Sequence, residues 1–381
     1  MLTLALTMSV TTLSTPVSFA KKKPSISQKK ISLKVGQKKQ LKLKNVKKAK
    51  IKKITWKSGN KKIATVSKSG LVKARKKGTT TIMATLDKKT YSCKVSVKKK
   101  TSVKYVDDPT NGDVHYTTPY DFREEKSDVT YGTVKTDTYY STTTNKNRRF
   151  AIVLPAGYDE NKKYPVCYLL HGLGQDHTDW LNANAPTIVG NMIAAGTAKE
   201  MILVLPNCRA RANDAAGPAD AFSLSNYQAF DNFLNDLRDN LMPYIKEHYS
   251  IKEGRENTAI AGFSMGGRTA LYIGMSMQET FGYIGGFAPA PGIFAYTMNG
   301  VTEKGLFTKE TFCLKDEYAE NTLLMIVAGK SDNIVGNIPQ TYHDALVENN
   351  TKHIWYRKAG GHDLTVMTNA LYNFTARLFT A

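Results

Sequence analysis

A serine flanked by glycines occupies a position from which it could act as a nucleophile. The segment GFSMGG at 262–267 follows an apolar run and precedes an amphipathic one, and its third residue is Ser264. A chain that turns from strand to helix within one residue leaves no room for bulky side chains two positions before and after the turn, and glycine meets that need. We therefore predict a strained turn that exposes the Ser264 hydroxyl.

A serine hydroxyl is a weak nucleophile at neutral pH and requires a neighbouring base. The chain has seven histidines. In strand-turn-serine-helix folds the chain order is serine, acid, histidine, which leaves His343, His353 and His362 as candidates. His343 falls in an expected helix and His353 opens an expected strand. His362 follows an apolar strand in the turn AGGHD at 359–363, so we predict that it is the general base.

The acid that orients the histidine should lie between the two and follow another strand. Of the nine carboxylates from Glu279 to Glu348, Asp332 alone comes directly after an apolar strand, in the run TLLMIVAGKSD. Its expected role is to hold the imidazole tautomer and stabilise the imidazolium. Asp363 is the alternative acid, and we expect it to point away from the histidine beside it.

Two backbone amides must bind the oxyanion that forms when the serine attacks a carbonyl carbon. One should be the amide of Met265, at the start of the helix after the turn, where the helix dipole helps. The second should come from the turn HGLG at 171–174, through the amide of Leu173. His171 is expected to be a structural residue of that turn.

These groups need a scaffold, and the apolar pattern from 129 to 381 supplies one. Strands that are apolar throughout alternate with segments of helical period, which indicates an α/β domain with a doubly wound, mostly parallel sheet. Ligands gather at the carboxyl edge of such a sheet. The expected strands are 149–155, 164–170, 200–207, 257–263, 283–290, 322–329 and 353–359, and the expected helices are 187–196, 227–248, 265–277, 337–349 and 365–379.

The preceding part of the chain has a different composition. Residues 1–20 are uncharged and end in small residues, as a secretory signal peptide does, although no basic residue precedes the apolar run. Residues 24–98 alternate with period two and predict a small all-β sandwich. Residues 99–128 have no apolar period and are expected to form a linker, partly packed on its neighbour.

The charge of the chain is concentrated in the β-rich segment. Residues 21–100 hold 29 Lys or Arg and one acid, Asp87, whereas the rest of the chain is mildly acidic, and the total is +22. Lysines dominate and no nucleic-acid recognition motif is present, so we expect adhesion to polyanions rather than a nucleic-acid partner. No segment predicts a membrane span.

The four cysteines, Cys93, Cys167, Cys208 and Cys313, lack metal-ligand spacing, and no glycine-rich phosphate loop is present. We expect neither a metal nor an organic cofactor. A bridge between Cys208 and Cys313 is permitted by an exported location but not indicated by spacing.

Both parts of the chain resemble known families. The segments WKSGN, IATVS, SGLV, GTTTI and YSCKVSV resemble a bacterial Ig-like domain of group two, which usually serves as a spacer or adhesion module. From about residue 131, the segments FAIVLPAGYDENKKYPVCYLLHGLGQDHTDW, AIAGFSMGGRTAL, GKSD and AGGHDLTVMTNALYNF resemble the esterase group of the α/β-hydrolases, in particular carbohydrate esterase family one. That family contains feruloyl and acetyl xylan esterases. The resemblance implies the triad Ser264, Asp332 and His362, with Leu173 and Met265 in the oxyanion hole.

The expected function is therefore that of a secreted serine esterase acting on feruloyl or acetyl esters of a xylan-type polysaccharide. Two loops, 207–225 and 292–321, should overhang the site, and Trp180 could offer a stacking surface to substrate. The basic module could bind an anionic cell-wall polymer. An acyltransferase with the same triad, and a non-catalytic glycan-binding surface protein, remain alternatives.

Overall fold

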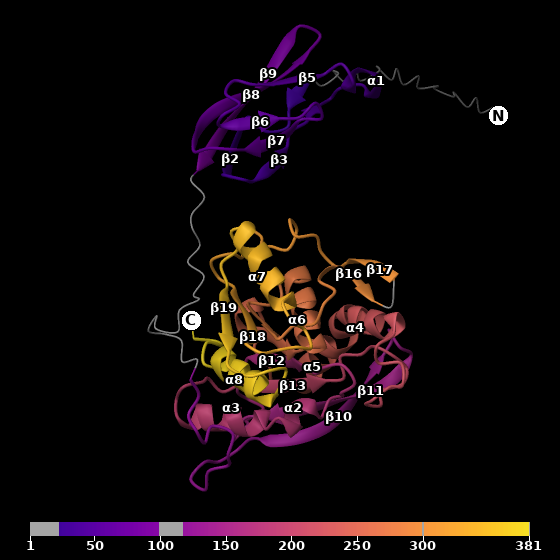
Figure 1. Cartoon of the computed structure of the whole chain (residues 1–381), viewed down its shortest axis with the longest axis vertical. Coiled ribbons are helices and arrows are strands. Elements are labelled where there is room, and N and C mark those ends of the chain that lie inside the picture. The colour runs from indigo at the N-terminus through magenta and orange to yellow at the C-terminus, as the bar shows by residue number, and fades with distance from the viewer. Residues whose placement is uncertain (1–22, 99–116, 299–300, 381) are drawn as a thin grey trace, which may run out of the picture. The chain divides into compact units, whose positions relative to one another are not determined.

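The computed structural model describes residues 23–98, 117–298 and 301–380. The chain divides into two compact units, Met1–Ser102 and Val103–Ala381. Figure 1 shows the elements of both units. The expected signal peptide at 1–20 and most of the expected linker lie outside the described residues.

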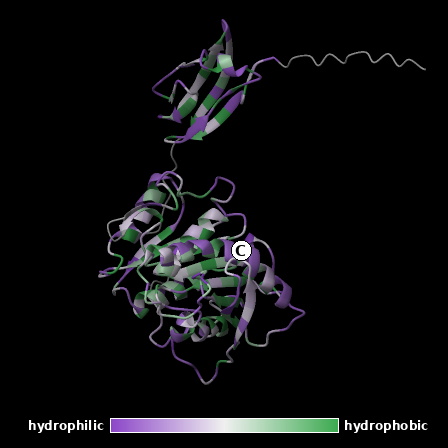
Figure 2. Cartoon of the chain, turned by 90° about the vertical axis from the view of Figure 1, so that its right-hand side faces the viewer, coloured by the Kyte–Doolittle hydropathy of each residue, from purple (hydrophilic) through white to green (hydrophobic). Residues whose placement is uncertain are grey.

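The first unit is built from two small sheets with strand orders β2-β9-β8-β5 and β3-β7-β6, and β1 pairs with β4. Its side chains alternate between the core and solvent, so hydrophobic and hydrophilic residues alternate along the strands (Figure 2). Leu41, Ile82 and Val95 are fully buried between the sheets. The elements are β1 (Ser25–Ile26), β2 (Lys30–Lys34), β3 (Lys38–Gln40), β4 (Leu43–Lys44), α1 (Lys48–Ile51), β5 (Thr55–Ser58), β6 (Ala64–Val66), β7 (Leu71–Ala74), β8 (Gly78–Leu86) and β9 (Lys89–Lys98).

The second unit is organised around one eight-stranded sheet of order β10-β11-β13-β12-β14-β15-β18-β19. The six strands from β13 to β19 run parallel, while β10 and β11 join the edge antiparallel. The prediction of a mostly parallel, doubly wound sheet is confirmed. The strands are β10 (Thr133–Ser141), β11 (Lys146–Leu154), β12 (Val166–Leu170), β13 (Ile202–Pro206), β14 (Thr258–Phe263), β15 (Tyr283–Phe287), β18 (Leu323–Gly329) and β19 (Ile354–Lys358).

Helices cover both faces of this sheet, which explains why its central strands are buried throughout. Helices α3 and α8 pack against each other on one face, and α4 contacts α6 on the other (Figure 1). The helices are α2 (Asp179–Asn182), α3 (Ala185–Ala194), α4 (Leu224–Asp236), α5 (Met242–His248), α6 (Met265–Ser276), α7 (Ile338–Glu348) and α8 (Leu364–Thr375).

The helix expected at 227–248 is interrupted by a π-helical turn, Leu237–Leu241, between α4 and α5. Pro243 lies at the start of α5 and has no amide hydrogen, so the regular helical ladder cannot continue through it. A hairpin of β16 (Phe294–Met298) and β17 (Val301–Gly305) lies within the loop expected at 292–321.

Two further features concern the whole chain. All four cysteines are free, so Cys208 and Cys313 are not bridged. Within the described ranges, no helix combines the length and the apolar character needed to cross a bilayer.

Candidate active site

Ser264 occupies a strained turn between β14 and α6. Its backbone has φ 58° and ψ −120°, a left-handed conformation that residues other than glycine rarely adopt. Neighbouring backbone packs tightly around the turn: a Cβ at Gly266 would lie 2.1 Å from the Leu170 carbonyl oxygen, and one at Gly262 would lie 2.4 Å from the Gly266 carbonyl carbon. The requirement for glycine on both sides of the serine therefore has a direct steric cause.

The carboxylate of Asp332 holds the imidazole of His362. Its Oδ2 lies 2.8 Å from His362 Nδ1. Its Oδ1 accepts the amide hydrogens of Ile334 at 2.9 Å and Val335 at 3.1 Å. The Asp332 side chain is fully buried, so these bonds fix its position. With Nδ1 bound to the carboxylate, Nε2 of His362 is left for the nucleophile.

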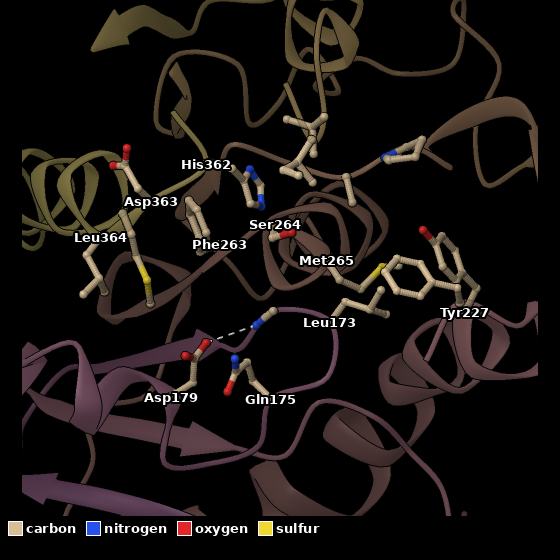
Figure 3. A pocket seen from close by; sticks show the side chains of 17 residues that line it. Leu173, Gln175, Asp179, Tyr227, Phe263, Ser264, Met265, His362, Asp363 and Leu364 are labelled. Atoms are coloured by element: carbon tan, nitrogen blue, oxygen red, sulfur yellow. Dashed lines mark hydrogen bonds between the residues drawn. The ribbon is translucent and has the colours of Figure 1, made fainter. Parts of the chain in front are cut away.

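The imidazole of His362 and the side chain of Ser264 lie beside each other at the centre of a pocket (Figure 3). The ring of Phe263 packs against the imidazole with centroids 4.6 Å apart. No hydrogen bond between the Ser264 hydroxyl and His362 is formed among the described residues. Such bonds are often long without substrate and tighten in the substrate complex.

The alternative residues have other partners. Asp363 caps α8 by accepting the Val366 amide at 3.1 Å and also accepts the Gly361 amide at 2.7 Å. His343 and His353 are buried and joined through Nδ1 and Nε2 at 2.8 Å. The structure thus brings together the three residues predicted as the triad.

The two predicted oxyanion donors flank Ser264. Met265 is the first residue of α6, so its amide is among those that a helix leaves without an internal acceptor. Leu173 lies across the pocket (Figure 3), and its amide donates to no backbone carbonyl of the described residues. The turn that carries Leu173 is held by Asp179, whose Oδ2 accepts the Gly172 amide at 3.2 Å. Sequence reasoning did not find Asp179.

His171 supports the same turn from behind. Its Nδ1 lies 2.8 Å from the Gly172 carbonyl oxygen and its Nε2 accepts the Cys208 amide at 3.0 Å. Burial lowers the pKa of His171 to about 4, while the hydrogen bonds to Gly172 and Asn207 oppose that shift. The imidazole is therefore neutral at neutral pH, and its contacts are with the backbone and side chains that support the turn.

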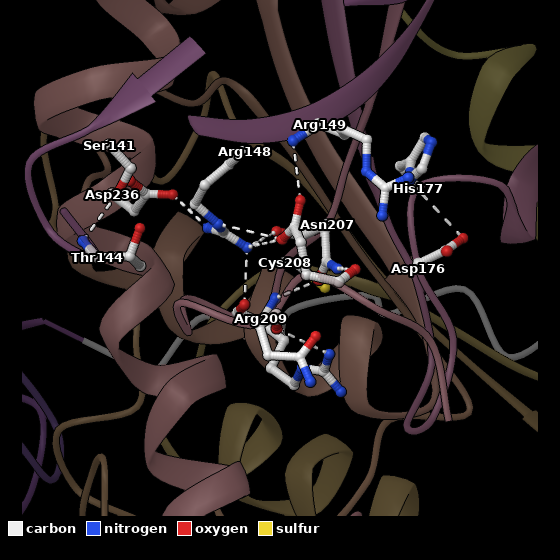
Figure 4. A network of polar contacts seen from close by, with 12 residues as sticks. Ser141, Thr144, Arg148, Arg149, Asp176, His177, Asn207, Cys208, Arg209 and Asp236 are labelled. Atoms are coloured by element: carbon white, nitrogen blue, oxygen red, sulfur yellow. Dashed lines mark hydrogen bonds and ion pairs between the residues drawn. The ribbon is translucent and has the colours of Figure 1, made fainter. Parts of the chain in front are cut away.

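A buried polar network anchors the loop that follows β13 (Figure 4). The Arg148 guanidinium forms ion pairs with Asp236 and, at 3.1 Å, with Asp214. It also donates at 2.7 Å to the carbonyl oxygens of Asn207 and Arg209. Farther along this loop, the Gly217 amide donates to the Gly174 carbonyl at 2.7 Å, so the network steadies the oxyanion turn as well.

The pocket around Ser264 has a volume of about 590 Å³, within the usual range for small-molecule sites. Its lining is mainly apolar, with polar groups from Gln175, Asp179 and Asp363. Three exposed large hydrophobic residues of the chain lie on its wall: Phe222, Ile334 and Leu364, with exposed fractions of 73%, 71% and 46%. Water-exposed apolar groups gathered at one pocket indicate a site for an apolar ligand group.

Phe222 comes from the loop expected to overhang the site, while the wall residues Ile334 and Leu364 were not predicted. Each comes two residues after the predicted acid or histidine, and an apolar residue at that spacing is the sequence signal that could have indicated them.

The prediction that Trp180 stacks on substrate is wrong. The indole is 1% exposed and does not line the pocket. Its Nε1 donates to the Leu170 carbonyl at 3.0 Å, and its ring packs edge-on against Phe287. Because α2 turns this side chain inward against β12, it braces the strand that leads into the oxyanion turn.

Comparisons with known proteins cover both units. Residues 141–381 match the family model described as "Putative esterase", and residues 22–98 match that of the bacterial Ig-like domain (group 2). Both resemblances predicted from the sequence are thereby confirmed.

Two curated relatives are modular proteins. An endo-1,4-beta-xylanase/feruloyl esterase of Xylanibacter ruminicola is 32% identical over 43% of this chain and 23% of its own length. Endo-1,4-beta-xylanase Y of Acetivibrio thermocellus is 30% identical over 43% of this chain and 15% of its own. The chain thus spans less than a quarter of either relative.

Among solved structures, a ferulic acid esterase of carbohydrate esterase family one from Anaeromyces mucronatus is 41% identical. Its structure in complex with ferulic acid matches with a TM-score of 0.65, covering 70% of this chain and 97% of that chain. The likeness extends over almost the whole of that enzyme.

Proposed function

Because the chain belongs to the esterase family over residues 141–381, we propose that it is a serine carboxylic-ester hydrolase in which Ser264 forms an acyl-enzyme. The observation that carries the proposal is the 2.8 Å contact of Asp332 Oδ2 with His362 Nδ1, beside a strained serine in the same pocket. A buried carboxylate, an oriented imidazole and an exposed hydroxyl form the set that activates a serine.

The proposed reaction begins when Nε2 of His362 removes the Ser264 proton as Oγ attacks the ester carbonyl carbon. Asp332 holds the Nδ1 hydrogen and stabilises the imidazolium. The amides of Leu173 and Met265 stabilise the oxyanion, and each such donor contributes roughly 3 to 4 kcal/mol to the transition state. The imidazolium then protonates the departing alcohol. Water, activated by the same imidazole, hydrolyses the acyl-enzyme and restores the serine.

The proposed substrates are feruloyl or acetyl esters of a xylan-type polysaccharide. The apolar wall of Phe222, Tyr227 and Ile334 provides the surface that an aromatic acyl group would bury. The names of the relatives, which include ferulic acid esterase and xylanase/feruloyl esterase, support the same class. Of the two acyl groups, feruloyl fits the size and apolar lining of the pocket better.

The proposal extends to location and partner. The uncharged segment at 1–20 supports export, and the basic Ig-like module supports binding to an anionic cell-wall polymer. Both would place the esterase close to insoluble polysaccharide.

The test is hydrolysis of methyl ferulate and p-nitrophenyl acetate by the wild type and two variants. Ser264→Ala should lower kcat by on the order of 10⁴-fold or more, because the nucleophile is lost. Ser276→Ala, an exposed serine at the far end of α6, is the matched control and should retain activity. Equal rates in wild type and Ser264→Ala would overturn the proposal.

Product analysis separates the alternatives. Free ferulate released in water, with none of it moved to added oligosaccharide, supports hydrolysis over acyl transfer, since the acyl-enzyme is common to both. Covalent labelling of Ser264 by a fluorophosphonate would contradict a purely glycan-binding role.

A further inference from the structure

The outward face of the four-stranded sheet in the Ig-like unit carries rows of lysines and hydroxyl residues. Side chains on a strand alternate between faces, so the residues between the buried positions of β2 and β9 point outward together. Strand pairing aligns them: Lys30 lies beside Lys94, and Lys34 beside Lys98. Between these two rows lies a hydroxyl row of Ser32, Ser96 and Thr79.

The spacing of the face follows from strand geometry. Paired lysines lie on strands about 5 Å apart, and the two lysine rows are four residues, or about 13 Å, apart along the strands. The hydroxyl row lies midway between them. The face is therefore a grid in which cationic rows and a hydrogen-bonding row alternate.

The charges on this face are not neutralised within the unit. Asp87 is the sole acid from Lys21 to Lys100, and it forms its ion pair with Lys50 at 2.5 Å. Like charges side by side on a sheet destabilise it. Rows of like charge therefore lower the stability of the unit, and no carboxylate of the unit compensates for the repulsion. An external anion that binds the lysines would explain why the rows are present.

We propose that this face, defined by Lys30, Lys34, Lys94 and Lys98 with the intervening hydroxyl row, binds a polysaccharide that carries carboxylate groups. The inference rests on the proposed function, whose anionic wall polymer it assigns to a surface and a chemical class. Ammonium groups pair with carboxylates, while serine and threonine hydroxyls both donate to and accept from sugar hydroxyls. Parallel rows of ammonium and hydroxyl groups suit an extended chain that presents both kinds of partner.

The experiment measures binding of the full-length protein to polygalacturonate, with neutral xylan and inorganic polyphosphate as comparison polymers. The face variant replaces Lys30, Lys34, Lys94 and Lys98 by Gln. The matched control removes the same charge from exposed lysines off this face, by Lys→Gln at Lys38, Lys61, Lys62 and Lys68.

The face variant should bind polygalacturonate at least tenfold more weakly than the wild type, and the control variant less than threefold more weakly. Binding of the wild type should fall with added salt, as expected for an ionic interface. The melting temperature of the face variant should equal or exceed that of the wild type, because Gln removes repulsion without disturbing the core.

Three results would overturn the inference. Equal weakening in the face and control variants would mean that net charge alone drives binding. Neutral xylan bound as tightly as polygalacturonate would exclude a carboxylate requirement, and polyphosphate bound as tightly would exclude a polysaccharide-specific face. Failure of the wild type to bind any of the polyanions would instead contradict the wall-polymer part of the proposed function, and methyl ferulate hydrolysis reports on the esterase part separately.

Discussion

At the scale of single residues, the site depends on groups that are individually constrained. The left-handed backbone conformation at Ser264 costs roughly 1–3 kcal/mol of folding free energy. It persists because the backbone packed against Gly262 and Gly266 leaves no room for another conformation of the turn. Asp332 is held by two amides and His362 by that carboxylate and by Phe263. Each constraint reduces the motion that would otherwise separate nucleophile from base.

Asp179 constrains the oxyanion turn in a similar way. Its carboxylate accepts the Gly172 amide next to Leu173, and burial raises its pKa while that hydrogen bond opposes the shift. We predict that Asp179→Ala lowers kcat for methyl ferulate by roughly tenfold with little change in KM, because a loosened donor weakens the transition state more than the ground state. Asp179→Asn keeps an acceptor for the amide and should restore most of the rate.

Asp176→Ala is the matched control for this prediction. Asp176 lies in the same loop and accepts from the Thr178 amide and hydroxyl rather than from Gly172. Its loss should change the melting temperature more than kcat. If Asp179→Asn proved as slow as Asp179→Ala, the charge of Asp179, rather than its bond to the turn, would be what matters.

At the scale of elements, the parallel sheet assembles the site. The ends of β12, β14, β18 and β19 lead into the oxyanion turn, the serine, the acid and the histidine, and these strands run in the same direction. Their carboxyl ends therefore meet along one edge, which is where ligands bind in such folds.

Two buried histidines connect α7 to β19. His343 Nδ1 lies 2.8 Å from His353 Nε2, His353 Nδ1 lies 2.8 Å from the Thr351 carbonyl oxygen, and His343 stacks on Trp355 at 5.0 Å. Burial lowers the pKa of His353 to about 4, the Thr351 hydrogen bond opposes that shift, and His343 adds to it. His353 is therefore neutral in the folded protein at neutral pH.

The lowered pKa of His353 makes the stability of the folded protein depend on pH. In the unfolded chain a histidine titrates near pH 6.5, so between about pH 6.5 and 4 the unfolded state binds more protons. Neutral, buried His353 therefore contributes fully to stability above pH 6.5. As the pH falls towards 4, this contribution is lost and the free energy of unfolding decreases by about 3 kcal/mol. Urea unfolding followed by tryptophan fluorescence at pH 7.5, 6.5, 5.5 and 4.5 measures it.

The free energy of unfolding should change less with pH in His353→Leu than in the wild type, even though that variant has lower stability overall. His248→Gln, which removes an exposed histidine of α5, is the control and should keep the wild-type slope. A wild-type slope retained in His353→Leu would contradict the assignment, and His171 would then be the remaining buried histidine with a lowered pKa of about 4.

At the scale of the whole molecule, the buried residues of the described ranges form two separate hydrophobic cores. One is formed by buried residues of the Ig-like unit and the other by those of the esterase unit. The match to the solved ferulic acid esterase covers 97% of that chain and 70% of this one.

We predict that a chain of residues 103–381 folds and hydrolyses methyl ferulate with a kcat/KM within roughly twofold of the full-length value, since a unit with its own core can fold alone. The same truncation should abolish salt-sensitive retention on polygalacturonate. Hydrolysis of a soluble ester and retention on the polymer are measured on one preparation. Loss of soluble-ester activity despite a folded protein would show that the Ig-like unit contributes to the active site.

Much of this protein could be predicted from the order of its residues, because the decisive patterns are local. Apolar runs, helical periods and a serine between glycines specify strands, helices and the turn at Ser264 without knowledge of distant contacts. The edge strand β10 was missed because TVKTDTYYS is largely exposed and joins the sheet only by pairing with β11. A strand whose residues are mostly polar and exposed carries no apolar run from which it could be predicted, even when its partner is the next strand along the chain.

The sequence also indicated the three residues of the proposed triad, since each follows a strand whose end must lie at the same edge. The tertiary structure decided which way individual side chains near the pocket point. Trp180 turned inward against Leu170, whereas Asp179, next to it in sequence, holds the oxyanion turn, and Phe222 and Leu364 form the wall. The orientation of a side chain on a short helix or loop depends on what packs against it, and that information is held by residues distant in sequence.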